Sequence, residues 1–89
     1  MTTEERLWEW VRNYLAQVRG VAAESVTVDR GLSSYGLDSI DAVLMAGELE
    51  ESFGIEIDAA SFIACDSFSE IITKLASDVD QAGERRVSL

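Results

Sequence analysis

Apolar side chains recur every three or four residues along three stretches of the chain, which is the spacing of an amphipathic helix. The stretches are about 2–19, 39–53 and 68–79, and a shorter one at about 59–64 has the same character. Gly20 and Gly54 follow two of them, where a glycine commonly ends a helix. Between 21 and 37 the helical spacing is missing, and no second strand is available to pair with Val26-Thr27-Val28. The pattern therefore predicts an all-α four-helix bundle, with three longer helices, one short helix and a long loop between helices 1 and 2.

Polar residues with helix-capping chemistry stand in front of three predicted helices. Thr2 and Glu5 have the spacing of a capping box, in which a hydroxyl and a carboxylate satisfy the first backbone N–H groups of a helix. Ser67 and Glu70 repeat that spacing at the last helix, and Asp58 can cap the short helix over 59–64. We expect the last two helices to bury a set of apolar side chains: Phe62, Ile63, Phe68, Ile71, Ile72, Leu75 and Val79.

The loop over 21–37 is long for a compact domain, and such loops are usually functional. We expect it to be ordered and held on the bundle by Val26, Leu32 and Tyr35. Ser33 and Ser34 are hydroxyls within it, but no helix start follows them directly. We therefore interpret both serines as turn residues.

The helix predicted over 39–53 has apolar residues on two opposite faces. At about 100° per residue, one face gathers five residues that suit a core: Ala42, Met45, Ala46, Leu49 and Phe53. The opposite face, which we call the outer face, consists of Ile40, Val43, Leu44 and Gly47. One helix of a small domain cannot bury both faces, and acidic residues flank the outer one: Asp41, Glu48, Glu50 and Glu51. An apolar centre with a charged rim is typical of a docking surface, and the alternative is that the preceding loop covers it with Leu32 and Leu37.

The start of this helix is a candidate attachment site for an anionic group. Asp38 stands at the N-cap position, and Asp41 adds negative charge to the first turn, where the helix dipole is positive. Ser39 is then the first helical residue, with its hydroxyl at a loop–helix corner facing solvent. Helix N-termini favour anionic oxygens, so this corner suits a serine-linked phosphodiester. The simpler alternative is that Asp38 caps the helix and Ser39 merely follows it.

The composition describes one acidic domain. The chain has 89 residues, of which 17 are acidic and 7 basic, and its net charge is −10. We assign residues 1–80 to the folded domain and 81–89 to a flexible C-terminal tail, because the apolar pattern stops after Val79. The charge disfavours nucleic acids and anionic membranes and favours encounter with basic protein surfaces. Cys65 is the only Cys, so no internal disulfide can form, and we interpret it as a small buried apolar residue.

The first residues and the hydropathy predict a cytoplasmic location. Met1 to Glu5 lack the basic segment and the apolar run of a signal peptide. No stretch of the sequence is long and apolar enough to span a bilayer, so we expect no membrane association.

Catalysis by this chain alone is not expected. The sequence has no His, and Lys74, its single Lys, falls in the middle of the last helix. A serine nucleophile needs a neighbouring base, and Ser39 has only carboxylates near it in the sequence. No dedicated metal site is expected either, because the carboxylates that could contribute spread around the helix: Asp38, Asp41, Glu48 and Glu51.

Two motifs flank the second predicted helix at its start and at its exit. Gly36-Leu37-Asp38-Ser39-Ile40 precedes Leu49-Glu50-Glu51-Ser52-Phe53-Gly54-Ile55-Glu56-Ile57. With both motifs, and from about Glu4 to about Val79, the chain resembles the acyl carrier proteins of fatty acid and polyketide synthesis. The resemblance implies an acyl-carrier-like bundle and a 4'-phosphopantetheine group, derived from coenzyme A and attached at Ser39. The attachment motif around that serine would consist of Gly36, Leu37 and Asp38.

The resemblance also implies how such a protein acts. The thiol of the arm would hold an acyl group as a thioester, and the protein would be a monomeric tether. Its partners would be a phosphopantetheinyl transferase, a ketosynthase, and an acyltransferase or an acyl-activating ligase. The residues given a partner-facing role are Asp38, Ile40, Asp41, Leu44, Glu48 and Glu51, and the outer face adds Val43 and Gly47.

Particular residues favour polyketide or other specialised metabolism over housekeeping fatty acid synthesis. The Gly-Leu-Asp-Ser-Ile motif and Leu44 resemble polyketide carriers, since many fatty-acid carriers have an acidic residue where Leu44 stands. The family often has Pro-Thr where this chain has Asp66-Ser67. The alternatives are a peptidyl carrier, a helical adaptor that uses the outer face without an arm, and an acidic regulatory subunit. The cargo, whether acyl, aminoacyl or dipeptidyl, is not fixed by any residue.

Overall fold

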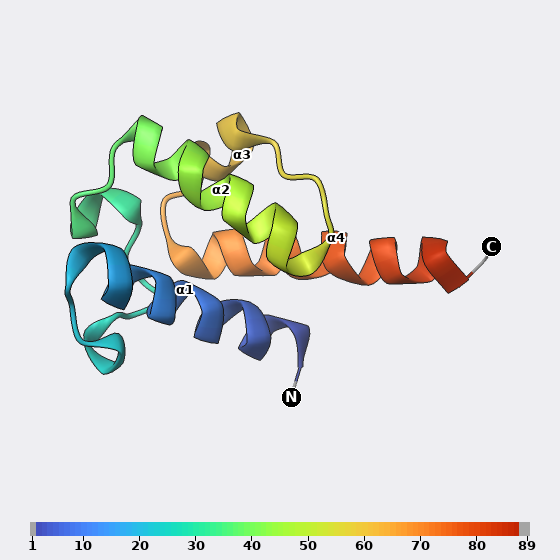
Figure 1. Ribbon diagram of the computed structural model, residues 1–89, viewed down its shortest axis with the longest axis horizontal. Coiled ribbons are helices and arrows are strands. Elements are labelled where there is room, and N and C mark those ends of the chain that lie inside the picture. Colours follow the sequence, from blue (N-terminus) through green and yellow to red (C-terminus); the bar gives the residue numbers. More distant parts are fainter. Residues whose placement is uncertain (1, 88–89) are drawn as a thin grey trace.

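The computed structural model describes residues 2–87, with side chains placed for residues 2–81. Within this range four α-helices form a bundle (Figure 1), and two short 3₁₀ turns lie in the loop before the second helix. The helices are α1 (Thr3–Arg19), α2 (Ser39–Phe53), α3 (Ala59–Ala64) and α4 (Phe68–Val87), and the turns are η1 (Ala23–Ser25) and η2 (Leu32–Tyr35). α1 packs along α4, and α3 packs against α2. The predicted all-α bundle of three longer helices and one short helix is confirmed.

The ends of the first two helices follow from the local sequence. The Thr2 hydroxyl accepts a hydrogen bond from the backbone N–H of Glu5 at 3.1 Å, and the Glu5 carboxylate accepts one from the N–H of Thr2 at 3.2 Å. The predicted capping box of α1 is therefore confirmed. Gly20 and Gly54 end α1 and α2 with φ angles of 69° and 65°, a left-handed conformation that glycine adopts without steric cost.

The core lies between the apolar faces of the helices and is completed from the loop. Its buried helical residues are Leu7, Val11, Leu15, Ala42, Met45, Ala46, Leu49, Phe62, Phe68, Ile71, Ile72, Leu75 and Ala76. The loop adds Val26, Leu32 and Leu37, and Phe53 packs against the core half-buried. The predicted core face of α2 is thus confirmed.

One predicted core residue is wrong. Phe62 is buried, but Ile63 exposes 42% of its surface. Successive residues on a helix point about 100° apart, and α3 is only six residues long. With Phe62 directed into the core, Ile63 is therefore directed out of it.

The last helix begins and ends differently from the prediction. The Ser67 hydroxyl accepts from the N–H of Glu70, but the Glu70 carboxylate accepts from the N–H of Asp66, one residue before the expected partner. α4 continues to Val87, beyond Val79, where its apolar pattern stops, and its last turns extend past the rest of the bundle (Figure 1). Residues 88–89 of the predicted tail lie outside the described residues, and the flexibility of the tail stays a prediction. No described helix combines the length and apolarity that a bilayer crossing requires.

The α1–α2 loop is tied to the start of α4 through the backbone. The N–H of Phe68 donates to the carbonyl oxygen of Arg30 at 2.8 Å, and the N–H of Ser69 donates to that of Val28 at 2.9 Å. The first N–H groups of a helix have no partner within it, so the loop satisfies two of them. These bonds fix the path into α4 at Asp66-Ser67, a segment without proline.

Tyr35 holds the same loop to α1. Its phenolic oxygen accepts from the N–H of Thr27 at 3.1 Å, and its carbonyl oxygen accepts from Nε of Arg19 at 3.1 Å. Its ring lies 5.7 Å from that of Phe68. The prediction that Val26, Leu32 and Tyr35 hold an ordered loop is confirmed, and the loop delivers the chain to Ser39 along a fixed path.

Candidate functional site

Ser39 is the first residue of α2, and it is exposed. Asp38 caps the helix: its Oδ1 accepts from the N–H of Asp41 at 2.9 Å, and Oδ2 of Asp41 accepts from the N–H of Asp38 at 3.3 Å. The sequence predicted the cap, but not that Asp41 returns the bond. This hydrogen bond from the backbone of Asp41 is the main cause that lowers the pKa of Asp38 below its usual 3.8. Ser39 therefore lies in a helical turn that two reciprocal hydrogen bonds between Asp38 and Asp41 stabilise.

Gly36 and Leu37 shape the approach to that turn. Gly36 has a φ of 75°, and its N–H donates to the carbonyl oxygens of Leu32 and Ser33, which ends η2. Leu37 is buried, and its N–H donates to the carbonyl oxygen of Leu32 at 3.1 Å. The motif residues before Asp38 thus fix the backbone, and they leave the hydroxyl of Ser39 free to face solvent.

A groove of about 230 Å³ opens beside Ser39. It runs between η2, the start of α2, and the segment from α3 to α4. Its lining residues are Gly31, Leu32, Ser33, Leu37, Asp38, Ser39, Ala42, Ile63, Cys65 and Asp66. Ile63, which is exposed, is one of them. Sequence periodicity did not indicate Ile63 as a site residue, because it assigned this residue to the core.

These features fit a flexible arm joined through a phosphodiester. The hydroxyl of Ser39 is accessible to a modifying enzyme, and the start of α2 favours anionic oxygens next to it. The groove offers polar and apolar atoms along which a chain can lie. The residues present therefore suit a prosthetic group at Ser39.

The outer face of α2 is open to solvent. Ile40, Val43 and Leu44 expose 70%, 51% and 60% of their surfaces. Leu32 and Leu37 point into the core, so the loop does not cover this face. A Cβ added at Gly47 would meet no atom within 4 Å, so another backbone could approach the helix closely there. An exposed apolar face is therefore present where the sequence predicted a docking surface, and its docking role stays a prediction.

The acidic rim of the outer face is smaller than the sequence indicated. Glu48 and Glu51 are exposed, and Asp41 is half-buried at the cap. Glu50 is half-buried, and its Oε2 accepts from the N–H of Ile57 at 2.7 Å. Glu50 therefore stabilises the connection from α2 to α3, and it does not belong to the rim.

Cys65 is half-buried against the core, which agrees with an apolar packing role. Its Sγ donates to the carbonyl oxygen of Ser61 at 3.3 Å, and burial is the main cause that raises the pKa of its thiol above 9.0. Among the described residues, no three His, Cys, Asp or Glu side chains gather as metal ligands.

Comparisons with known proteins agree with this geometry. Residues 9–75 match the family described as the phosphopantetheine attachment site. The acyl carrier protein of Campylobacter hominis is 32% identical over 68 residues, which cover 75% of this chain and 86% of that protein. Polyketide synthase 2 of Metarhizium acridum is 30% identical over 64 residues, and orsellinic acid synthase ArmB of Armillaria ostoyae is 29% identical over 70 residues. These matches cover 72% and 78% of this chain but only 3% of each synthase.

The chain therefore belongs to the phosphopantetheine-attachment family, as an acyl carrier protein. A member of this family carries a covalent 4'-phosphopantetheine group and tethers acyl intermediates on it. The chain spans a small fraction of the two synthases, so their complete activities do not transfer to it.

Proposed function

We propose that Ser39 is the attachment residue and that the chain presents acyl groups to partner enzymes of polyketide or other specialised metabolite biosynthesis. The observation that carries the assignment is the exposed Ser39 hydroxyl at the N-terminus of α2, beside the groove. When bound, the arm supplies a thiol that carries the acyl group as a thioester.

The protein's own residues hold and orient the attachment point. Asp38 and Asp41 close the turn, so a transferase meets the Ser39 hydroxyl in one backbone geometry. The groove bordered by Leu37 and Ile63 gives the attached arm a surface of polar and apolar atoms along which it can lie. Tethering keeps the cargo at a high effective concentration near any enzyme docked on the same helix. The chain contributes position and address, and we propose that catalysis belongs to its partners.

The outer face of α2 is the proposed partner-binding surface. A partner groove can take an amphipathic helix through apolar anchors with helical spacing, here Ile40, Val43 and Leu44. Asp41, Glu48 and Glu51 would select partners with basic residues at the edge of that groove. The expected partners are a phosphopantetheinyl transferase, a ketosynthase, and an acyltransferase or acyl-activating ligase. We further propose that the protein acts as a monomer in the cytoplasm.

Two observations support a polyketide pathway. Two of the relatives are named as a polyketide synthase and an orsellinic acid synthase. Leu44 is exposed in the centre of the outer face, which makes this face more apolar than that of carriers with an acidic residue there. We propose an acyl cargo, whereas an aminoacyl cargo would indicate a peptidyl carrier.

Intact-mass analysis tests the assignment. The purified protein is incubated with coenzyme A and a phosphopantetheinyl transferase, and one arm should be added per chain. Ser39→Ala should remain unmodified with an unchanged circular dichroism spectrum. Ser33→Ala is the matched control, because Ser33 lines the same groove, and it should be loaded like the parent. An unmodified parent, or an arm on Ser39→Ala, would refute the assignment.

A second candidate function is favoured by the exposure of the outer face alone: an adaptor that binds one partner through Leu44 and its neighbours without an arm. For an adaptor, Ser39→Ala should retain full activity in the pathway, while Leu44→Glu should lose partner binding. For a carrier, both variants should lose activity.

A further inference from the structure

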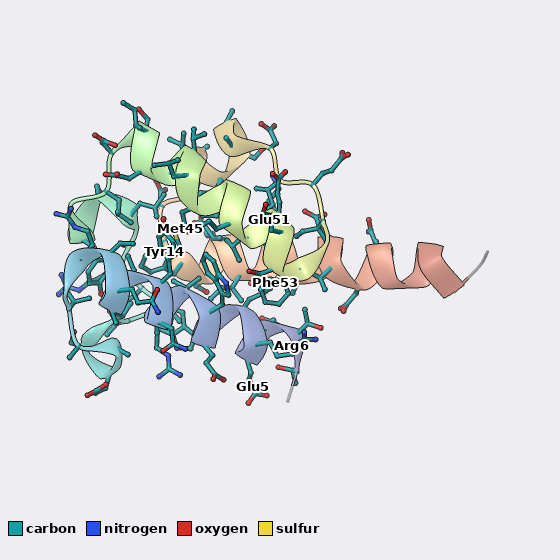
Figure 2. All side chains as sticks on the ribbon, viewed as in Figure 1. Glu5, Arg6, Tyr14, Met45, Glu51 and Phe53 are labelled. Atoms are coloured by element: carbon teal, nitrogen blue, oxygen red, sulfur yellow. The ribbon has the colours of Figure 1, made fainter. Side chains whose placement is uncertain are left out.

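A second groove, of about 360 Å³, lies between α1 and α2. Its lining residues are Trp10, Asn13, Tyr14, Gln17, Glu48, Glu51 and Ser52. It shares no lining residue with the groove beside Ser39. Figure 2 places Tyr14 in the space between the two helices. The groove therefore adds residues of α1 to a flank of α2 that carries part of the acidic rim.

One wall of this groove is a fixed aromatic pair. The rings of Trp10 and Tyr14 are stacked, with centroids 4.9 Å apart and planes 12° apart. Nε1 of Trp10 donates to Oγ of Ser52 at 3.1 Å, which ties the indole to α2. Both side chains are half-buried, so part of each still borders the groove. Because the stacked rings cover each other's inner faces, the pair can offer a planar cation one of its outer faces.

The groove is also negatively charged. Glu48 and Glu51 line it, and none of its lining residues is basic. Burial is the main cause that raises the pKa of the Tyr14 phenol. The charge of Glu48, the hydrogen bond between Tyr14 and Glu48, and the charge of Asp41 raise this pKa further. The nearby arginines of α1 face other rings: Arg6 lies 5.5 Å from the centroid of Phe53, and Arg12 lies 5.7 Å from that of Trp8.

We propose that this groove binds an arginine side chain of a basic partner protein, with the guanidinium against Trp10 and Tyr14 and its N–H groups paired with Glu48 and Glu51. Arginine fits better than lysine, because its guanidinium is planar, weakly hydrated and able to stack and donate at once. The inference extends the proposed function, on which it rests for the partner being a protein that reads the carrier. The proposal extends the partner-binding surface from the outer face of α2 to a surface that α2 shares with α1.

The test uses a defined probe on the whole protein. Acetyl-(Arg-Gly)₄-amide is titrated into the ¹⁵N-labelled chain at low salt, and acetyl-(Lys-Gly)₄-amide is titrated in parallel. The indole N–H signal of Trp10 and the backbone signals of Glu48 and Glu51 should shift, while the indole signal of Trp8 should not. The arginine peptide should bind at least about threefold more tightly than the lysine peptide, the scale of one exposed cation–π contact. Equal affinity for the two peptides would overturn the proposal.

Charge variants separate the groove from the general acidity of the chain. Glu48→Gln and Glu51→Gln should each lower the affinity for the arginine peptide about two- to fivefold, as expected for exposed ion pairs. Glu24→Gln, on η1, removes the same charge outside the groove and should change the affinity less than either. If Glu24→Gln lowers the affinity as much as Glu48→Gln and Glu51→Gln do, the affinity depends only on net charge and the proposal fails.

The same titration distinguishes this inference from the proposed function. Ser39→Ala should bind the arginine peptide like the parent, because Ser39 does not line this groove. Failure of arm loading on the parent protein would refute the attachment site and leave the groove intact. Normal arm loading together with no shift at Trp10 would refute the groove alone.

Discussion

Gly31 and Asp66 lie in backbone contact, although they are far apart in the sequence. Gly31 is buried, and a Cβ added to it would lie 2.5 Å from the carbonyl oxygen of Asp66. The neighbouring bond from the N–H of Phe68 to the carbonyl oxygen of Arg30 holds the two segments at that distance. Because Gly31 and Asp66 also line the groove beside Ser39, this contact sets the shape of the proposed site.

Gly31→Ala should therefore destabilise the protein. The new methyl group meets backbone, which cannot rotate away, and we expect a loss of about 1–3 kcal/mol in the free energy of unfolding, as for overpacked cores. Urea denaturation followed by circular dichroism measures this change. Gly47→Ala is the matched control: nothing lies within 4 Å of its added Cβ, so helix propensity should raise stability by about 0.5–1 kcal/mol. Equal effects of the two substitutions would contradict the contact.

The cap at α2 should make stability depend on pH. Hydrogen bonding lowers the pKa of Asp38 below 3.8, so the folded state favours the charged carboxylate. Its contribution is complete above the unfolded pKa of about 3.9, and it is lost as the pH falls through the lower folded value. The difference in melting temperature between the parent and Asp38→Asn should therefore be larger at pH 7 than at pH 2.5. A difference that grows towards acid pH would contradict the assigned cap.

The helices and their caps could be predicted because their signals are local. Asp38 follows a loop and precedes a periodic stretch, and Gly20 and Gly54 stand directly after such stretches. The two faces of α2 could also be separated, because a helix of 15 residues is long enough for periodicity to distinguish Met45 from Leu44. The same local pattern indicated the Ser39 hydroxyl at the start of this helix as a candidate attachment site, and the family resemblance implied which group it would carry.

The remaining features depend on contacts that no local pattern encodes. Ile63 looked like a core residue, because a helix of six residues is too short for its two apolar neighbours to be told apart. The carboxylate of Glu50 looked like part of the rim until the chain after α2 brought the N–H of Ile57 to it. The apolar stripe of α4 marked where the helix packs, and it could not mark where its backbone ends at Val87.

Cys65 should react slowly with thiol reagents in the native protein. Its thiol is half-buried, donates to the carbonyl oxygen of Ser61, and has a raised pKa caused mainly by burial. The thiolate is the reactive form, so iodoacetamide at pH 8 should modify the native chain more slowly than the chain in 8 M urea. The rate should rise with pH, since deprotonation supplies the nucleophile. Equal rates in the two states would mean that Cys65 is freely accessible.

Leu44→Glu should impair partner recognition without harming the fold. Leu44 exposes 60% of its surface on the outer face, so a carboxylate there replaces apolar contact with charge, while the free energy of unfolding should change by less than about 0.5 kcal/mol. With a phosphopantetheinyl transferase, kcat/KM for loading Ser39 should fall at least about tenfold, the scale of losing one interface anchor. Val18→Glu is the matched control, because Val18 is also an exposed apolar residue, at 48%, but lies on α1. If both variants load equally well, the outer face of α2 is not the surface that the transferase reads.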